Sequence, residues 1–297
     1  MSRLRADILL LIVSIIWGTA FVAQKIANEA MSPLWFVGVR FLISAALLAL
    51  PAFIEHKKSS ALITRGALRT SVAISICLAI GACLQQSALV TASATNGGFL
   101  TAIYVVLVPF TSWMLTRERV RPVVFLAGLA AVAGAYLLGA HGALQSWSPG
   151  DVLLIVSDIA WAFAISMVAI FLKRASRPFF LAFLQFTVTG VVGVFAAVMI
   201  EGPLPGGLSS ALPALLYCSI ISGGIAYTLQ VIAQGHTTAP EAALIMSLES
   251  IFAAITGALW LGERLTPLAM LGCALILLGV VAAEIGPLNL MGRRRAL

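Results

Sequence analysis

The chain has 297 residues, of which 61% are hydrophobic and only 10% are charged. A soluble domain of this length needs far more charged surface, so the composition excludes one and predicts a polytopic membrane protein. The formal charge of +7 is typical of some nucleic-acid-binding proteins, but here the basic residues form short clusters between apolar runs. No basic domain remains for a nucleic-acid partner, and we expect none.

Ten apolar runs of about 20 residues follow one another, and each is long enough to cross a hydrocarbon core of about 30 Å. The first run is too long for the h-region of a signal peptide and no clear cleavage motif follows it, so we expect a retained helix. The loops are too short to fold as soluble domains. The predicted spans cover about residues 6–28, 33–54, 67–89, 95–116, 119–140, 150–172, 178–200, 210–233, 239–261 and 266–286.

The cationic residues indicate how the chain crosses the membrane. If the N-terminus is cytoplasmic, fifteen of the eighteen Lys and Arg residues fall in cytoplasmic segments and only Arg264 falls outside. Lys25 and Arg40 lie within spans. An excess of Lys and Arg in cytoplasmic loops is the general rule for multi-span proteins. We therefore expect both termini to be cytoplasmic.

A short polar motif occurs twice and points to an internal repeat. Residues 116–122 are TRERVRP and residues 261–267 are LGERLTP, so the shared Glu-Arg-x-x-Pro pattern recurs after 145 residues. Five predicted spans separate the two copies, which places them on opposite sides of the membrane and explains why only the cytoplasmic copy keeps its extra arginines. We predict two inverted five-helix repeats, residues 1–144 and 145–297.

Trp17 and Trp161 are partners in this repeat, at a displacement of 144 residues, and both fall near the middle of a span. An indole N–H at that depth needs a hydrogen-bond partner or a water-filled cavity. One interpretation is that both rings are bulky core residues. The other is that they form two aromatic walls across a central cavity.

Polar side chains on helical faces favour a cavity. Two amides and a phenol share one stripe of span eight, and this is too polar for packing alone. Gln85 in span three is the repeat partner of Gln230, and Tyr104 in span four is the partner of Glu249. The span-eight stripe consists of Ser219, Gly223, Tyr227, Gln230 and Gln234.

Ionisable residues inside spans are functional candidates. Glu249 is the deepest carboxylate, and it is either a structural hydrogen-bond partner, a proton carrier or a contact for a substrate ammonium. Asp158 is expected to form an ion pair with Lys25 or Arg40, unless those two side chains extend toward the membrane surface. Glu241 follows Thr238 by three residues, which predicts a capping box at the start of span nine.

The chain lacks signals of catalysis. The three histidines lie in or beside loops, the four cysteines have no metal-ligand spacing, and no familiar hydrolase or phosphate-loop motif occurs. We expect neither an enzyme nor a bound cofactor or metal. The glycine pair at 97–98 and Pro109 would let span four bend. Spans five and ten carry small-residue ladders, such as Ala127, Ala131 and Ala135, and are expected to pack behind the bundle.

The chain resembles the EamA-like ten-helix permeases of the drug/metabolite transporter superfamily. The residues that carry the resemblance are Trp17, Gly18 and Phe21 in W-G-x-x-F, and residues 262–267 in G-E-R-x-x-P. Within that group it is most similar to YddG-type exporters of aromatic amino acids. The resemblance implies the cytoplasmic (inner) membrane of a bacterium, and a central cavity lined mainly by spans one, three, four, six, eight and nine.

The resulting hypothesis is an exporter of small metabolites that works by alternating access around a midplane cavity. Its partners would be a small-molecule substrate, most simply an aromatic or other neutral amino acid, and membrane lipid, and one chain would suffice as a functional monomer. The alternative is a proton-coupled exporter of lipophilic cations or drugs that depends on Glu249. A non-transporting scaffold or sensor is disfavoured because the short loops leave little surface for partners.

Overall fold

The computed structural model describes residues 1–59, 63–139, 148–204, 206, 208–262, 264 and 266–294, with side chains described throughout except at 138, 139 and 283–294. Every regular element in these ranges is a helix, which confirms the predicted all-α class. The elements are α1 (Arg3–Ala30), α2 (Pro33–Lys58), α3 (Arg65–Ala88), α4 (Ala94–Thr101), α5 (Tyr104–Thr116), α6 (Pro122–Gly139), α7 (Pro149–Arg174), α8 (Pro178–Ile200), α9 (Leu208–Leu216), the π-helix η1 (Tyr217–Tyr227), α10 (Thr228–Gln234), α11 (Ala239–Met246), α12 (Glu249–Trp260) and α13 (Pro267–Arg294).

These elements correspond to the ten predicted spans, because three of the spans are each divided into two or three consecutive helices. The fourth span consists of α4 and α5, the eighth of α9, η1 and α10, and the ninth of α11 and α12. Eight segments are long and apolar enough to cross a bilayer, and α6 and α13 contain two shorter apolar stretches, Pro122–Leu137 and Pro267–Ala282. The predicted boundary between the two repeats, at residues 144 and 145, lies outside the described residues.

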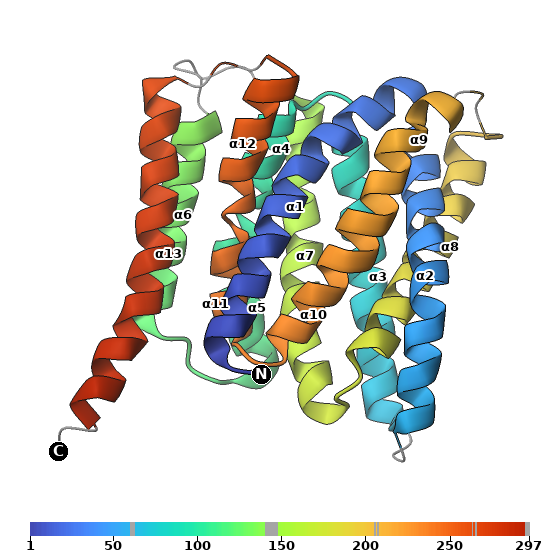
Figure 1. Ribbon diagram of the computed structural model, residues 1–297. Helices are drawn as coiled ribbons and strands as arrows, with labels where there is room; N and C mark the ends of the chain where they lie inside the picture. Colours follow the sequence, from blue (N-terminus) through green and yellow to red (C-terminus); the bar gives the residue numbers. More distant parts are fainter. Residues whose placement is uncertain are drawn as a thin grey trace.

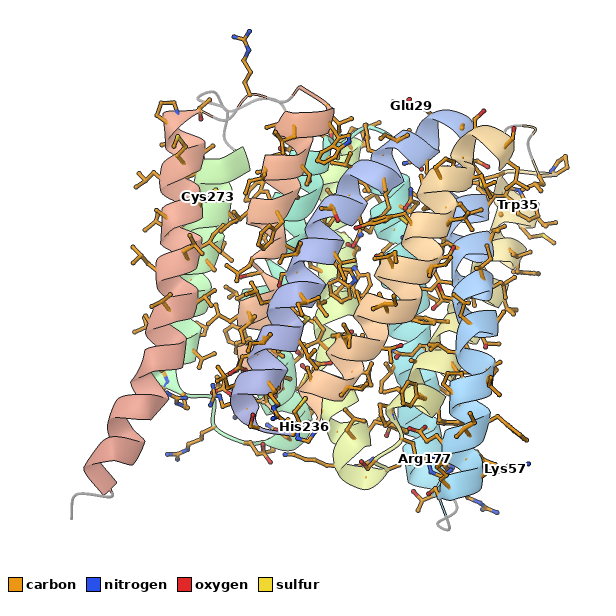
Figure 2. The ribbon with its side chains drawn as sticks, viewed as in Figure 1. Glu29, Trp35, Lys57, Arg177, His236 and Cys273 are labelled. Atoms are coloured by element: carbon orange, nitrogen blue, oxygen red, sulfur yellow. The ribbon has the colours of Figure 1, made fainter. Side chains whose placement is uncertain are left out.

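The outer surface and the two ends of the bundle suit a membrane. Large apolar side chains such as Phe195 and Leu259 are exposed on the outside, where lipid tails would solvate them. The start of α1 and the last turns of α13 lie at the same end (Figure 1). Figure 2 places Lys57 and Arg177 at that end as well, and Trp35 at the opposite end. This arrangement agrees with the side-to-side bias of the cationic residues.

The fourth and ninth spans are interrupted at equivalent positions of the two repeats. Residues 102–103 separate α4 from α5, and residues 247–248, displaced by 145, separate α11 from α12. At both places backbone N–H groups donate to the carbonyl three residues earlier, over 3.0–3.2 Å. Such 3₁₀ turns tighten a helix and redirect it. Pro109, which the sequence suggested as a point of bending, lies farther along, inside α5.

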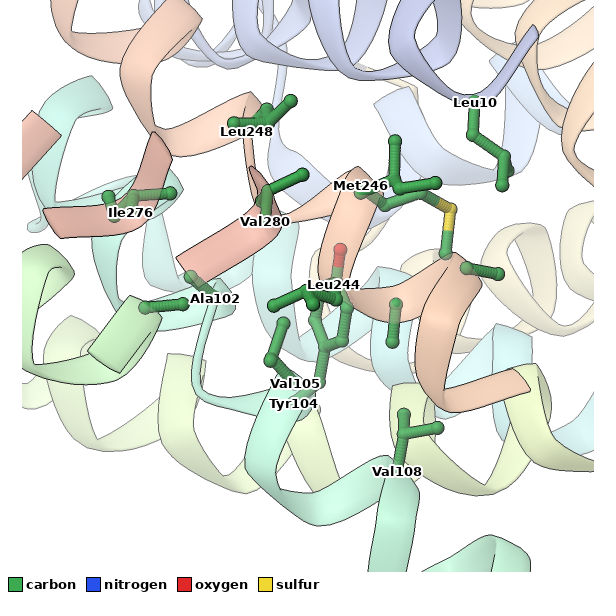
Figure 3. Close-up of a cluster of buried hydrophobic side chains, with 14 of the residues drawn as sticks. Leu10, Ala102, Tyr104, Val105, Val108, Leu244, Met246, Leu248, Ile276 and Val280 are labelled. Carbon is green, nitrogen blue, oxygen red and sulfur yellow. The ribbon is translucent and has the colours of Figure 1, made fainter. Parts of the chain in front are cut away.

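Apolar packing holds these interruptions in place. Figure 3 shows Tyr104 and Val105 of α5 beside Leu244 of α11, with Met246 of α11 and Leu10 of α1 close to each other nearby. All five side chains are buried and belong to one hydrophobic cluster. Because the cluster draws on both repeats, it joins the two halves of the bundle at its centre.

The α6–α13 pair provides direct evidence for a two-fold relation between the repeats. A Cβ atom on Gly134 would lie 2.5 Å from the carbonyl oxygen of Gly272, and one on Gly279 would lie 2.8 Å from that of Ala127. Gly134 and Gly279 differ by 145 residues, and so do Ala127 and Gly272. Each repeat therefore makes the same contact to the other, as expected for two halves related by a two-fold axis. The two helices stand together at one edge of the bundle (Figure 1).

A second pair, α2 and α8, is joined by reciprocal capping. Glu201, just after α8, accepts the backbone N–H groups of Leu34 and Trp35 at 2.9 and 3.1 Å. Glu55, near the end of α2, accepts those of residues 179 and 180 at 3.2 and 2.8 Å. The first N–H groups of a helix have no partner within it, and the positive end of the helix dipole favours a carboxylate. Each helix thus caps the other.

Candidate functional site

A cavity with about 50 Å³ of free space lies inside the bundle. This is room for a few water molecules, so a solute as large as an amino acid requires the lining helices to separate. Seven of the side chains that the sequence predicted for a central cavity lie in its wall, contributed by α1, α3, α5, α7, η1, α10 and α12: Trp17, Gln85, Tyr104, Trp161, Tyr227, Gln230 and Glu249.

Aromatic rings cover one part of this wall, with Tyr227 at their centre. The Trp17 ring lies 4.8 Å from the Tyr227 ring between centroids, at 53°, and the Trp161 ring lies 6.1 Å from it in a stacked arrangement at 29°. Phe41 and Phe186 approach Tyr227 edge-on, at 6.4 and 5.5 Å. These offset and edge-on geometries are the ones that aromatic pairs prefer. Both indoles therefore line the cavity and contact one phenol.

The π-helix η1 shapes the wall beside Trp17. The Trp17 Nε1–H group donates to the carbonyl oxygen of Ser222 at 3.3 Å, and Ser44 Oγ donates to that of Ser219 at 2.7 Å. A Cβ atom on Gly223 would lie 2.3 Å from Ser44 Oγ, so glycine is needed for this close approach. A stripe drawn at 3.6 residues per turn fails across a π-helix. Accordingly, Gly223 lines the cavity, whereas Ser219 does not.

Tyr104 and Glu249 join the two interrupted spans. Tyr104 is the first residue of α5, Glu249 is the first residue of α12, and the two positions differ by 145 residues. The Tyr104 hydroxyl donates to Glu249 Oε1 at 3.1 Å, and both side chains are buried. Residues at equivalent positions of two-fold-related repeats can meet only close to the axis, so this hydrogen bond marks the centre of the molecule.

Several polar atoms of the cavity wall have no partner among the described residues. The Trp161 indole N–H, the Tyr227 hydroxyl and the Gln230 Oε1 atom are buried and make no hydrogen bond to this part of the chain. Gln230 uses only its amide nitrogen, which donates to Gln234 at 2.9 Å. Most buried polar groups in proteins are hydrogen-bonded, so a concentration of free donors and acceptors around one cavity indicates a place for water or a polar solute.

The ion pair predicted for Asp158 is not formed. Lys25 donates instead to the carbonyl oxygens of Leu89, Val90 and Ala92 at 2.9, 3.2 and 2.8 Å, where it satisfies the end of α3. Both carboxylate oxygens of Asp158 are buried and have no hydrogen-bond partner in the part of the chain that the structure describes, and neither Asp158 nor Lys25 lines the cavity. The prediction was wrong because carbonyls released at a helix end are invisible in a list of charged residues.

Arg40 also departs from expectation. It was predicted to pair with Asp158 or to extend to the membrane surface, but it is buried and lines the cavity. Phe41 and Gln185 join it there, so spans two and seven contribute to the wall in addition to the six spans expected. Gln24 of α1 was missed as well. The available signal was a glutamine inside an otherwise apolar run, the same signal that marked Gln85 in span three and Gln230 in span eight.

The capping box predicted at Glu241 is confirmed, and its carboxylate has a second role. Glu241 Oε1 lies 3.1 Å from an Arg121 nitrogen and 3.3 Å from an Arg3 nitrogen, while Thr238 closes the box. Arg3 starts α1 and Arg121 precedes α6. A single carboxylate therefore ties three elements together at the end of the bundle that carries the N-terminus.

Comparison with known proteins supports a transporter. An uncharacterized transporter of Archaeoglobus fulgidus is 32% identical over 288 residues, which is 96% of this chain and 87% of the relative. The uncharacterized transporter YwfM of Bacillus subtilis is 25% identical over 297 residues, covering 95% of this chain and 94% of the relative. A solved crystal structure with 18% identity superposes with a TM-score of 0.77, over 97% of this chain and 99% of that one, and shows the shared fold.

The family itself follows from a sequence model that matches twice. The model of the EamA-like transporter family matches residues 4–140 and again residues 148–283, one match in each half of the chain. Together with the apolar spans, the inverted repeats and the central cavity, these matches mean that the chain belongs to the EamA-like transporter family and is a multi-pass membrane transporter.

Proposed function

We propose that this transporter exports aromatic or other neutral amino acids, as YddG-type members of its family do. The observation that carries the proposal is a cavity wall in which Trp17, Trp161 and Tyr227 present aromatic faces beside polar atoms that have no protein partner. The rings would stack on an aromatic side chain. The indole N–H of Trp161 and the amides of Gln85 and Gln230 would bond to the polar ends of the solute.

The mechanism we propose is alternating access about the two-fold axis. The paired 3₁₀ interruptions divide the fourth and ninth spans into halves, and such divided helices at the centre of inverted repeats are the usual frame for a transport site. Rocking of the repeats would expose the cavity to each side in turn. The cationic end of the bundle would face the cytoplasm of a bacterial inner membrane, and one chain would suffice because it contains both repeats.

A second candidate is proton-coupled export of lipophilic cations or drugs. Glu249 favours it, because this buried carboxyl group lies on the cavity wall at the interruption of the ninth span. In that case, a proton and a cationic substrate would compete for the same carboxylate. Replacement by glutamine would then abolish both efflux and pH-driven exchange, whereas an amino-acid exporter without proton coupling would keep a pH-independent efflux, slowed by the loss of one substrate contact.

The test is efflux of labelled tryptophan, phenylalanine or alanine from proteoliposomes, with and without an imposed pH gradient. We expect faster efflux of the two aromatic amino acids than of alanine. Trp17→Ala and Trp161→Ala should each lower tryptophan efflux by about two- to twelvefold, since an aromatic contact contributes about 0.5–1.5 kcal/mol beyond buried area. Trp260→Ala is the matched control, because its ring is 70% exposed at the end of α12.

Two outcomes would refute this assignment. If folded wild-type protein transports none of the three amino acids, amino-acid export is excluded, and export of lipophilic cations or drugs becomes the leading assignment. Wild-type efflux rates in both tryptophan variants would show that the aromatic cluster is packing and not a substrate contact.

A further inference from the structure

Arg40 is a cation inside the membrane bundle whose surroundings do not neutralise it. It lies in the first half of α2, only 6% of its surface is exposed, and it forms part of the cavity wall. The guanidinium packs over the rings of Phe41 and Phe36, at 4.7 and 5.4 Å from their centroids. Aromatic faces stabilise a guanidinium and orient its plane, but they leave its N–H groups available in that plane.

No carboxylate is paired with Arg40 among the described side chains. The described ion pairs involve Arg3, Arg121 and Lys173 instead. The Arg40 Nε–H group is buried without a hydrogen-bond partner. Its sulfur neighbour, the thiol of Cys218 on the same wall, is only a weak acceptor. A buried charge normally has a partner, because its desolvation is costly without one.

The other cation inside a span shows how this chain satisfies such a group when the role is structural. Lys25 donates to three backbone carbonyls at the end of α3 and does not line the cavity. Arg40 differs in both respects, since it lines the cavity and lacks such acceptors. The missing partner of Arg40 would therefore come from the solute.

The ligand that fits is a carboxylate beside an aromatic group. A guanidinium binds a carboxylate through two parallel hydrogen bonds, and it does so most strongly where water is excluded. Phe41, on which Arg40 stacks, contacts Tyr227 edge-on, and Tyr227 contacts Trp17 and Trp161. A solute whose carboxylate reaches Arg40 would thus have its side chain beside these rings. A lipophilic cation would instead meet a like charge.

We propose that Arg40 binds the carboxylate of the transported solute and thereby selects amino acids over amines. This rests on the proposed function, in which the solute is an amino acid. Glu249, on the same wall, is the group available to the ammonium end. The cavity would then contain one cationic and one anionic contact, in agreement with a zwitterion.

The test compares three indole compounds in proteoliposomes: tryptophan, tryptamine, which lacks the carboxylate, and indole-3-propionate, which lacks the ammonium. Efflux from protein-free liposomes is subtracted. In the wild type, we expect tryptamine efflux to be about 10–100-fold slower than tryptophan efflux, the range for one charge-assisted contact. Arg40→Gln should slow tryptophan efflux by a similar factor and leave tryptamine efflux equal or faster. Arg40→Lys should be intermediate, since it keeps the charge and loses the paired geometry.

Arg264→Gln is the matched control for loss of one positive charge, because Arg264 is exposed, lies between α12 and α13, and does not line the cavity. It should leave the ratio of tryptophan to tryptamine efflux unchanged. An unchanged ratio in folded Arg40→Gln protein would overturn the proposal. If the Arg40 variants fail to fold, the wild type still decides: equal efflux of tryptamine and tryptophan would refute the role of Arg40.

The same experiment separates this inference from the proposed function. If the wild type exports no amino acid but exports indole-3-propionate in an Arg40-dependent manner, the carboxylate site stands and amino-acid export fails. If the wild type exports tryptophan and the Arg40 variants keep the full preference over tryptamine, amino-acid export stands and the carboxylate site fails.

Discussion

Replacing Glu201 by alanine should destabilise the α2–α8 pair by an amount that the structure allows us to bound. The carboxylate accepts two backbone N–H groups at the start of α2, from Leu34 at 2.9 Å and Trp35 at 3.1 Å. A hydrogen bond to a charged group contributes about 1.5–3 kcal/mol, and two of them would contribute about 3–6 kcal/mol if fully buried. Glu201 is only partly buried, so we expect a loss of about 2–3 kcal/mol.

The assay is the free energy of unfolding of the purified protein in mixed micelles, titrated with a denaturing detergent. Glu201→Gln keeps one acceptor oxygen and should lose about half as much as Glu201→Ala. Glu55→Ala, at the other end of the same pair, should resemble Glu201→Ala, since it also removes two N-terminal acceptors. The two sites lie at opposite ends of long helices, so their effects should add to within about 0.5 kcal/mol.

The control is Glu118→Ala, because Glu118 is 69% exposed and pairs with Lys173, which is 68% exposed. A surface pair of this kind contributes less than about 1 kcal/mol. If Glu201→Ala lowers the free energy of unfolding no more than Glu118→Ala does, the reciprocal capping of α2 and α8 contributes no measurable stability, and the predicted loss is refuted.

Three further predictions follow from single contacts. Gly134→Ala should lower the free energy of unfolding by about 1–3 kcal/mol, since its Cβ would lie 2.5 Å from the Gly272 carbonyl oxygen. Gly66→Ala should not, because its Cβ would meet only Thr64 Oγ1, at 4.0 Å; equal stability of the two variants would contradict the close α6–α13 packing. Lys25→Met should lower the free energy of unfolding by about 1–2 kcal/mol, because three carbonyl oxygens lose their donor. Amide hydrogen exchange at residues 89–92 should become faster, and slower exchange would contradict the prediction. Tyr104→Phe and Glu249→Ala should show a coupling of about 0.5–3 kcal/mol in a double-mutant cycle of unfolding, and additive effects would mean that their 3.1 Å hydrogen bond contributes nothing.

The internal repeat made part of the candidate site predictable from the sequence. The displacement of 145 residues identified Tyr104 and Glu249 as equivalent, and the structure shows that they are in contact. That contact was not predictable, because equivalence places two residues symmetrically about an axis without saying how far each lies from it. Trp17 and Trp161 were likewise found as partners, but their common contact, Tyr227, depends on how α1, α7 and η1 are packed.

Residues whose partners are distant in the sequence were predicted poorly. Lys25 was expected to pair with Asp158 or to extend toward the membrane surface, because charge is visible in a sequence, whereas the carbonyls at the end of α3 are not. Arg40 was placed at the membrane surface or in an ion pair, and its burial against Phe41 appears only after α2 is packed. The span-eight stripe was misplaced in part because η1 does not have the turn of an α-helix.

Properties that depend on composition and local periodicity could be read directly from the residues. The apolar runs and the two copies of the Glu-Arg-x-x-Pro motif were enough to predict a membrane environment, ten spans and an inverted repeat. Which side chains share the cavity, and which of them lack a partner among the described residues, became known from the packed helices. The reason is physical: the transfer of a helix into lipid depends on its own residues, whereas the environment of a buried charge such as Arg40 depends on every helix that surrounds it.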